Sequence, residues 1–132
     1  MTDCLFCKII KKEISSFIVF EDKEVVAFLD IHPIREGHIL VVPKKHVEDF
    51  YDLTDKDLSH IFLITKKLSK KISKIFKPKK VGIVIAGLDV PHTHVHIIPM
   101  HEYHDITSKS TIEGKRLNPS EKELIATASK IK

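Results

Sequence analysis

Apolar residues rich in Val, Ile and Phe are grouped in five short stretches, each bounded by polar or turn-forming residues. Runs of this length and composition are typical of β-strands. The predicted strands span residues 17–21, 25–30, 38–43, 81–86 and 94–99. Polar, proline and glycine residues between the first three strands supply their turns. An antiparallel sheet is the simplest assembly of these strands.

A different period occupies residues 55–76, where apolar side chains recur every three or four residues and lysines take the opposite side. This pattern predicts one amphipathic helix that covers a face of the sheet. Thr54 is a suitable N-cap, Asp57 lies in the first turn, and Pro78 prevents the helix from continuing. Residues 101–117 show no period and are predicted to form a loop.

Two shorter helices are predicted near the ends of the chain, at residues 5–12 and 119–131. A chain of 132 residues with 42% apolar composition fits one compact domain. We therefore expect a single α+β domain over 1–132, with its core in 4–100 and a variable C-terminal segment in 101–132.

The net charge of +4 comes from lysine, because only Arg35 and Arg116 among the 22 basic residues are arginines. The chain has no Trp, and few aromatic side chains lie among the lysines to stack on bases. Nucleic acid is therefore not expected as a partner. The first residues lack the basic and apolar pattern of a secretory signal, and no apolar run reaches the length of a membrane span. We expect a cytoplasmic protein with no membrane partner.

Candidate chemistry is concentrated in residues 87–99, where His92, His94 and His96 alternate with other residues at the start of a predicted strand. Strand alternation predicts that the three imidazoles share one face. Three cations on one face would repel each other, so most of the rings should be uncharged near pH 7 and free to act as nucleophiles or metal ligands. Two further histidines, His38 and His46, flank the third predicted strand.

Together these segments resemble the histidine-triad (HIT) family, whose signature is histidines at alternate positions followed by apolar residues. The resemblance runs from Cys4 to about Pro99 and includes Ala27-Phe28-Leu29-Asp30-Ile31 and the segment 37–46. It implies an α+β fold with a five-stranded antiparallel sheet and one long helix, paired as a homodimer. It also implies a nucleotide hydrolase or nucleotidyl transferase that needs no organic cofactor.

Carried onto this chain, the resemblance implies that His94 attacks the α-phosphorus and forms a nucleotidyl-histidine intermediate, which water hydrolyses. His38 and His96 would donate to the phosphate oxygens, with loop amides near Asp89 and Val90 assisting. A backbone carbonyl would hold the second ring nitrogen of the nucleophile. The substrates implied are phosphoramidates, adenylated amines or dinucleoside polyphosphates with an AMP or GMP moiety.

By the same resemblance, Asp30 would accept the ribose hydroxyls. An apolar slot for the purine base would be formed by Leu5, Phe6, Ile9, Ile14, Phe28, Ile31, Leu40 and Val90. Each of these apolar residues is equally well explained as part of the core.

The two cysteines, Cys4 and Cys7, are spaced as a metal clip or a redox pair. A subset of the HIT family carries zinc, and its ligands would map to Cys4, Cys7, His46 and His92. Structural zinc is therefore the predicted cofactor, and two free thiols are the alternative.

The chain departs from common family members, which carry Asn and Gly in the fourth strand and Gln with a small residue after the loop glycine. The matching positions here are Val81, Ile83, Leu88 and Asp89. This departure leaves open a nucleotide-binding regulatory module with little catalysis. A third hypothesis is a zinc-dependent hydrolase in which the three triad histidines bind a catalytic metal, but no Asp or Glu alternates with them to supply the mixed donors of a hydrolytic metal site.

Overall fold

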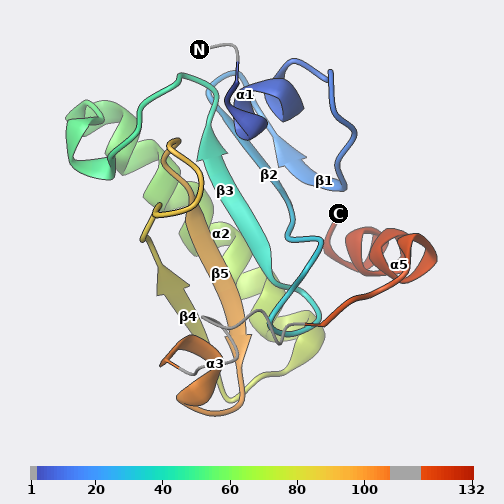
Figure 1. The fold of residues 1–132 in the computed structure, drawn as a ribbon. Coiled ribbons are helices and arrows are strands. Elements are labelled where there is room, and N and C mark those ends of the chain that lie inside the picture. Colours follow the sequence, from blue (N-terminus) through green and yellow to red (C-terminus); the bar gives the residue numbers. More distant parts are fainter. Residues whose placement is uncertain (1–2, 108–116) are drawn as a thin grey trace.

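The sheet forms the centre of the molecule (Figure 1), and the computed structural model describes residues 3–107 and 117–132. Its strands are all antiparallel and follow the order β1-β2-β3-β5-β4. They are β1 Ile18–Glu21, β2 Val25–Leu29, β3 Ile39–Pro43, β4 Lys80–Val84 and β5 Val95–Met100. The predicted α+β class and five-stranded antiparallel sheet are confirmed, and each strand boundary lies within two residues of its prediction.

The described helices are α1 Leu5–Ile10, the 3-10 helix η1 Phe50–Asp52, α2 Asp55–Phe76, α3 His104–Thr107 and α5 Glu121–Ile131. The long helix begins as predicted, because the Thr54 hydroxyl accepts the Asp57 N–H at 3.1 Å. α5 begins with a capping box between Ser120 and Glu123. The short α3 lies inside the predicted loop 101–117 and was not predicted. The rest of that loop, from residue 108 to 116, lies outside the described residues.

One face of the sheet packs against α2, which lies behind the strands in Figure 1. The main core joins alternate residues of β2, β3 and β5 to Ile61, Leu68 and Ile72 of α2. The C-terminal helix α5 belongs to this core through Leu124 and Ile131. Burial of this apolar surface is the main source of stability for the sheet and both helices.

The opposite face of the sheet carries α1 and a second, smaller cluster. Its members are Cys4, Phe6, Ile9, Val26, Phe28, Leu40 and Val42. Leu40 pairs with Phe28 on β2 and with His96 on β5, and residues paired across strands share a face. The sheet therefore presents His96 on the same face as α1 and this cluster.

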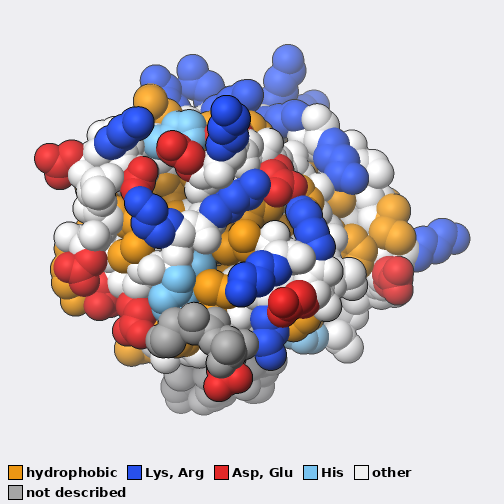
Figure 2. Space-filling view, turned by 90° about the horizontal axis from the view of Figure 1, so that it is seen from above, with side chains coloured by type: hydrophobic (Ala, Val, Ile, Leu, Met, Phe, Trp, Pro, Cys, Tyr) orange, Lys and Arg blue, Asp and Glu red, His pale blue; other side chains and the backbone are white. Residues whose placement is uncertain are grey.

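The surface of the molecule mixes charges of both signs. Figure 2 shows acidic side chains lying among the lysines over most of the face in view, with apolar side chains between them. Among the described residues, no helix is both long enough and apolar enough to cross a membrane.

Candidate active site

The three triad histidines do not share one strand. β5 begins at Val95, so His92 and His94 lie in the segment before it and only His96 lies within it. Strand alternation therefore applies to His96 alone, although Phe6 of α1 packs against both the His92 and the His94 ring. His92 turns toward the two cysteines, whereas the His94 and His96 rings lie side by side with centroids 5.0 Å apart.

His94 is 2% exposed, and the backbone holds one of its ring nitrogens. Its Nδ1 lies 2.7 Å from the carbonyl oxygen of His92. A carbonyl only accepts, so we assign the ring proton to Nδ1, which leaves the lone pair on Nε2. A backbone carbonyl was expected to hold the second ring nitrogen of the nucleophile. Here that carbonyl belongs to His92, two residues before His94. Phe6 packs edge-on against the ring, with centroids 4.9 Å apart.

His38 and His96 form a second hydrogen-bonded pair. His38 Nδ1 accepts the backbone N–H of Ile34 at 3.1 Å, so we place the proton of this ring on Nε2. That nitrogen lies 2.9 Å from His96 Nδ1 and 3.7 Å from a carboxylate oxygen of Asp30. Donation from His38 to His96 Nδ1 leaves a proton on His96 Nε2. His38 is only 1% exposed, whereas His96 is partly exposed.

The structure brings together the four predicted metal ligands, Cys4, Cys7, His46 and His92. Their ligand atoms lie within 4.8 Å of one another. His92 Nδ1 lies 3.4 Å from one sulfur and 3.5 Å from the other, and His46 Nδ1 lies 3.2 Å from Cys7 Sγ. Tetrahedral zinc with ordinary Zn–S and Zn–N bonds would separate sulfur and nitrogen by about 3.5 Å. The spacing of the donors therefore fits a zinc ion.

The orientation of the His92 ring also suits a ligand. Its Nε2 lies 2.7 Å from the Pro43 carbonyl oxygen, which fixes the proton there and leaves Nδ1 with its lone pair toward the sulfurs. Burial lowers the pKa of His92, and the neighbouring His46 and His94 rings lower it further. Burial raises the pKa of the Cys7 thiol, an effect that a bound cation would oppose.

This arrangement argues against a catalytic metal held by the three triad histidines. Both nitrogens of His92 face other groups, and Nδ1 of His94 faces a carbonyl oxygen. The Asp30, His38 and His96 cluster also brings its ligand atoms within 4.8 Å. A metal on His38 Nε2 would move the ring proton to Nδ1, against the N–H of Ile34, so this cluster suits proton donation better than metal binding.

The expected base-binding residues fall into two groups. Phe6, Ile9, Phe28, Leu40 and Val90 belong to the cluster on the α1 face. Ile31, Leu5 and Ile14 are instead 52%, 43% and 38% exposed. Asp30 stands at the end of β2, where one carboxylate oxygen accepts the N–H of His32 at 2.9 Å. An apolar surface therefore ends at a carboxylate near His38 and His96.

The loop before the triad is open to solvent. Leu88 is 97% exposed and Asp89 is exposed, whereas Val90 is half-buried. The Val90 carbonyl accepts the backbone N–H of His92 at 2.8 Å. Exposure of Asp89 reduces the cost of a carboxylate near a phosphate, because water screens exposed charges.

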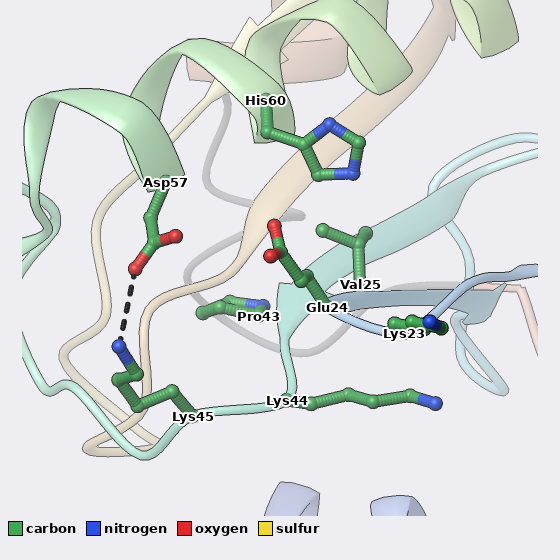
Figure 3. A pocket seen from close by; sticks show the side chains of 8 residues that line it. All are labelled: Lys23, Glu24, Val25, Pro43, Lys44, Lys45, Asp57 and His60. Carbon is green, nitrogen blue, oxygen red and sulfur yellow. Dashed lines mark hydrogen bonds and ion pairs between the residues drawn. The ribbon is translucent and has the colours of Figure 1, made fainter.

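Two hollows near the sheet are lined by residues other than His94. One of about 150 Å³, at the start of β2 and the end of β3, is lined by three lysines, Asp57 and His60 (Figure 3). Lys45 forms an ion pair with Asp57 at 3.4 Å there. A second hollow of about 230 Å³ reaches Asp30 and His38 from the side of α5. The geometry of the histidines, and not the size of a cavity, therefore identifies the candidate site.

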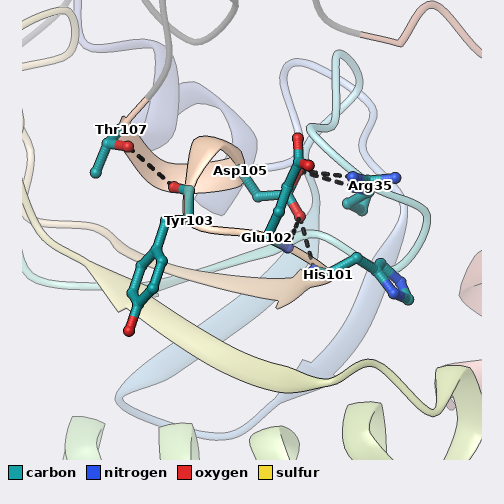
Figure 4. A network of polar contacts seen from close by, with 6 residues as sticks. All are labelled: Arg35, His101, Glu102, Tyr103, Asp105 and Thr107. Atoms are coloured by element: carbon teal, nitrogen blue, oxygen red, sulfur yellow. Dashed lines mark hydrogen bonds and ion pairs between the residues drawn. The ribbon is translucent and has the colours of Figure 1, made fainter.

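Sequence reasoning missed an ion pair beside the site. Arg35 contacts the buried Asp105 of α3, and both side chains appear in Figure 4. Arg35 is one of two arginines in the chain, which distinguished it from the lysines. Nothing in the sequence distinguished Asp105 from the other acidic residues. The carbonyls of Pro43 and His92, which orient two rings, carry no signal in the sequence at all.

Comparison with known proteins agrees with this geometry. The HIT domain family profile matches residues 11–103. An uncharacterized HIT-like protein of Borreliella burgdorferi is 44% identical over 75% of this chain and 76% of its own length. The crystal structure of a HIT-like protein involved in cell-cycle regulation from Bartonella henselae, with an unknown ligand, has a TM-score of 0.83 at 31% identity and covers 99% of this chain and 95% of its own. The chain belongs to the HIT family.

A relative with a described activity has a similar sequence identity to this chain. Adenosine 5'-monophosphoramidase HNT1 of Saccharomyces cerevisiae is 41% identical, and the match covers 75% of this chain and 63% of the yeast protein.

Proposed function

We propose that this chain is a nucleotide hydrolase that cleaves the bond between the α-phosphorus of a nucleotide and its leaving group, with His94 as the nucleophile. The observation that carries the proposal is the 2.7 Å contact between His94 Nδ1 and the His92 carbonyl. This contact leaves the Nε2 lone pair of an uncharged imidazole available for attack. It also stabilises the positive charge that develops on the ring when Nε2 bonds to phosphorus.

In the first step, His94 Nε2 bonds to the α-phosphorus while the bond to the leaving group breaks. The leaving group departs with the bonding pair and takes a proton, for which the Nε2–H of His96 is the candidate donor. In the second step, water attacks phosphorus and gives a proton back to His96 Nε2, the phosphorus–nitrogen bond breaks, and His94 regains its lone pair. Covalent catalysis thereby divides one difficult displacement into two easier ones.

The remaining histidines and Asp30 support this reaction. His96 donates to a phosphate oxygen, and His38 holds His96 in the tautomer that can donate. Asp30 accepts the ribose hydroxyls. Phe6, Phe28 and Leu40 contact the purine base of an AMP or GMP moiety. The yeast relative is described as a monophosphoramidase, which supports phosphoramidates and adenylated amines first and dinucleoside polyphosphates second.

We further propose that Cys4, Cys7, His46 and His92 bind a structural zinc ion. The ion would fix α1 to the sheet and hold the His92 residue whose carbonyl contacts His94. It takes no part in either chemical step. A homodimer in the cytoplasm remains the expected state of the protein.

The proposal is tested by trapping the intermediate. Enzyme is mixed with a radiolabelled adenylated amine, quenched within one turnover, digested and mapped by mass spectrometry. The label is expected on His94. The His94→Ala variant should lose turnover while still binding AMP, and His60→Ala, on the other side of the sheet, is the matched control that keeps activity.

Two outcomes contradict the proposal. A label on another residue overturns the role of His94. Tight AMP binding by the wild-type protein, with no turnover of phosphoramidates or dinucleotides, instead supports the nucleotide-binding module that Val81, Leu88 and Asp89 leave open.

A further inference from the structure

Asp105 is a buried carboxylate whose hydrogen bonds come from two separate parts of the chain. Asp105 is only 6% exposed. One oxygen accepts the backbone N–H groups of His101 at 2.7 Å and Glu102 at 3.2 Å (Figure 4). The other lies 2.9 Å from both Nε and Nη2 of Arg35. Burying a carboxylate is unfavourable without such donors, so this geometry is strongly specified.

Arg35 links this carboxylate to the backbone that surrounds His38. The Arg35 carbonyl accepts the backbone N–H of His38 at 3.1 Å, and the neighbouring Ile34 N–H donates to His38 Nδ1 at 3.1 Å. Two main-chain groups next to Arg35 thus fix both the position of His38 and the nitrogen that carries its proton. Displacement of the Arg35 side chain would move both groups.

We propose that the Arg35–Asp105 ion pair is a positioning device for the His38–His96 pair. The inference rests on the proposed function, because it assigns His96 as the donor to the phosphate. The ion pair holds the loop between β2 and β3, the Ile34 N–H keeps the His38 proton on Nε2, and that proton is donated to His96 Nδ1 at 2.9 Å. His96 is left with its own proton on Nε2, where a phosphate oxygen or a leaving group can accept it.

A second ion pair on the same loop provides a comparison. Glu36 pairs with Lys130 of α5 at 3.4 Å, and both side chains are about half exposed. Exposed ion pairs of this kind contribute little to the stability of the fold. The Glu36 carboxylate also accepts the Thr127 hydroxyl at 3.2 Å, so both of these Glu36 contacts lie on α5. Removal of Lys130 therefore perturbs the loop from outside without disturbing the His38 hydrogen bonds.

The experiment compares Asp105→Asn and Arg35→Lys with Lys130→Ala as the matched control. Imidazole ¹⁵N NMR of the full chain reports the His38 tautomer, and steady-state kinetics with adenosine 5'-phosphoramidate report kcat and KM. Asp105→Asn should give a mixture of His38 tautomers and a kcat lower by about 10- to 100-fold. KM should change by less than about 3-fold, because the lost contact acts mainly in the transition state.

Arg35→Lys keeps the cation but loses the two-nitrogen fork. Its kcat and its His38 tautomer ratio should therefore lie between those of the wild type and those of Asp105→Asn. It also tests the inference if Asp105→Asn fails to fold. Lys130→Ala should match the wild type in both readouts. A wild-type His38 tautomer in both folded positioning variants would overturn the inference. The NMR comparison needs no turnover, so it separates this failure from failure of the proposed reaction.

Discussion

Gly37 occupies a turn in which an added methyl group would meet two obstacles. It precedes His38 and has φ +96, the third residue of a turn closed by the His38 N–H and the Arg35 carbonyl. A Cβ built there would lie 2.7 Å from two ring atoms of Phe76. Gly87 also has a positive φ, +77, but nothing lies within 4 Å of its position. The two glycines therefore separate backbone strain from crowding.

Alanine at either glycine should incur the backbone strain, about 1–2 kcal/mol. Gly37→Ala adds displacement of the Phe76 ring, an overpacking cost of about 1–3 kcal/mol. The entropy that alanine removes from the unfolded chain favours both variants equally and cancels in the comparison. Gly37→Ala should therefore lower the free energy of unfolding by about 1–3 kcal/mol more than Gly87→Ala does.

Urea unfolding followed by far-UV circular dichroism measures this difference, provided that the m-values match. Phe76→Leu in the Gly37→Ala background should recover most of the crowding cost, which a double-mutant cycle isolates. Equal losses for the two glycine variants, or an additive cycle, would refute the reasoning, because Phe76 would then yield without cost.

Three further predictions follow from other contacts. Ile72 is fully buried, so Ile72→Ala should cost about 2–5 kcal/mol in urea unfolding, whereas Leu63→Ala, at 63% exposure, should cost far less. Burial raises the pKa of Asp105, but the His101 N–H and the Arg35 guanidinium outweigh it and the net pKa is lowered. Its stabilisation should be complete above about pH 4 and disappear as pH falls through the lowered value; an unchanged pH slope in Asp105→Asn would contradict this. Cobalt in place of zinc should give a tetrahedral thiolate spectrum with unchanged kcat, and Cys7→Ser should lose the bound metal and lower the melting temperature; a kcat that follows the metal would support a catalytic ion.

The sequence predicted the fold well because its signals are local. Short apolar stretches rich in Val, Ile and Phe defined the strands, and the three- and four-residue spacing in 55–76, with Thr54 before it and Pro78 after it, defined α2. The short α3 was missed because four residues carry too little periodicity to register. The C-terminal helix was found, but its packing into the main core was not.

The candidate site divides in the same way. Sequence alone identified the candidate residues, namely the histidines of the triad and the paired cysteines, since these types and spacings are visible in the chain. The family resemblance implied that His92 joins Cys4, 88 residues away, but only the tertiary structure shows the 3.4 Å contact between them and the 5.0 Å separation of the His94 and His96 rings. Arg35 and Asp105, 70 residues apart, likewise meet only in the folded protein. Hydrogen bonds depend on distances of a few ångströms, and periodicity specifies a face of an element but not the groups that packing brings against it.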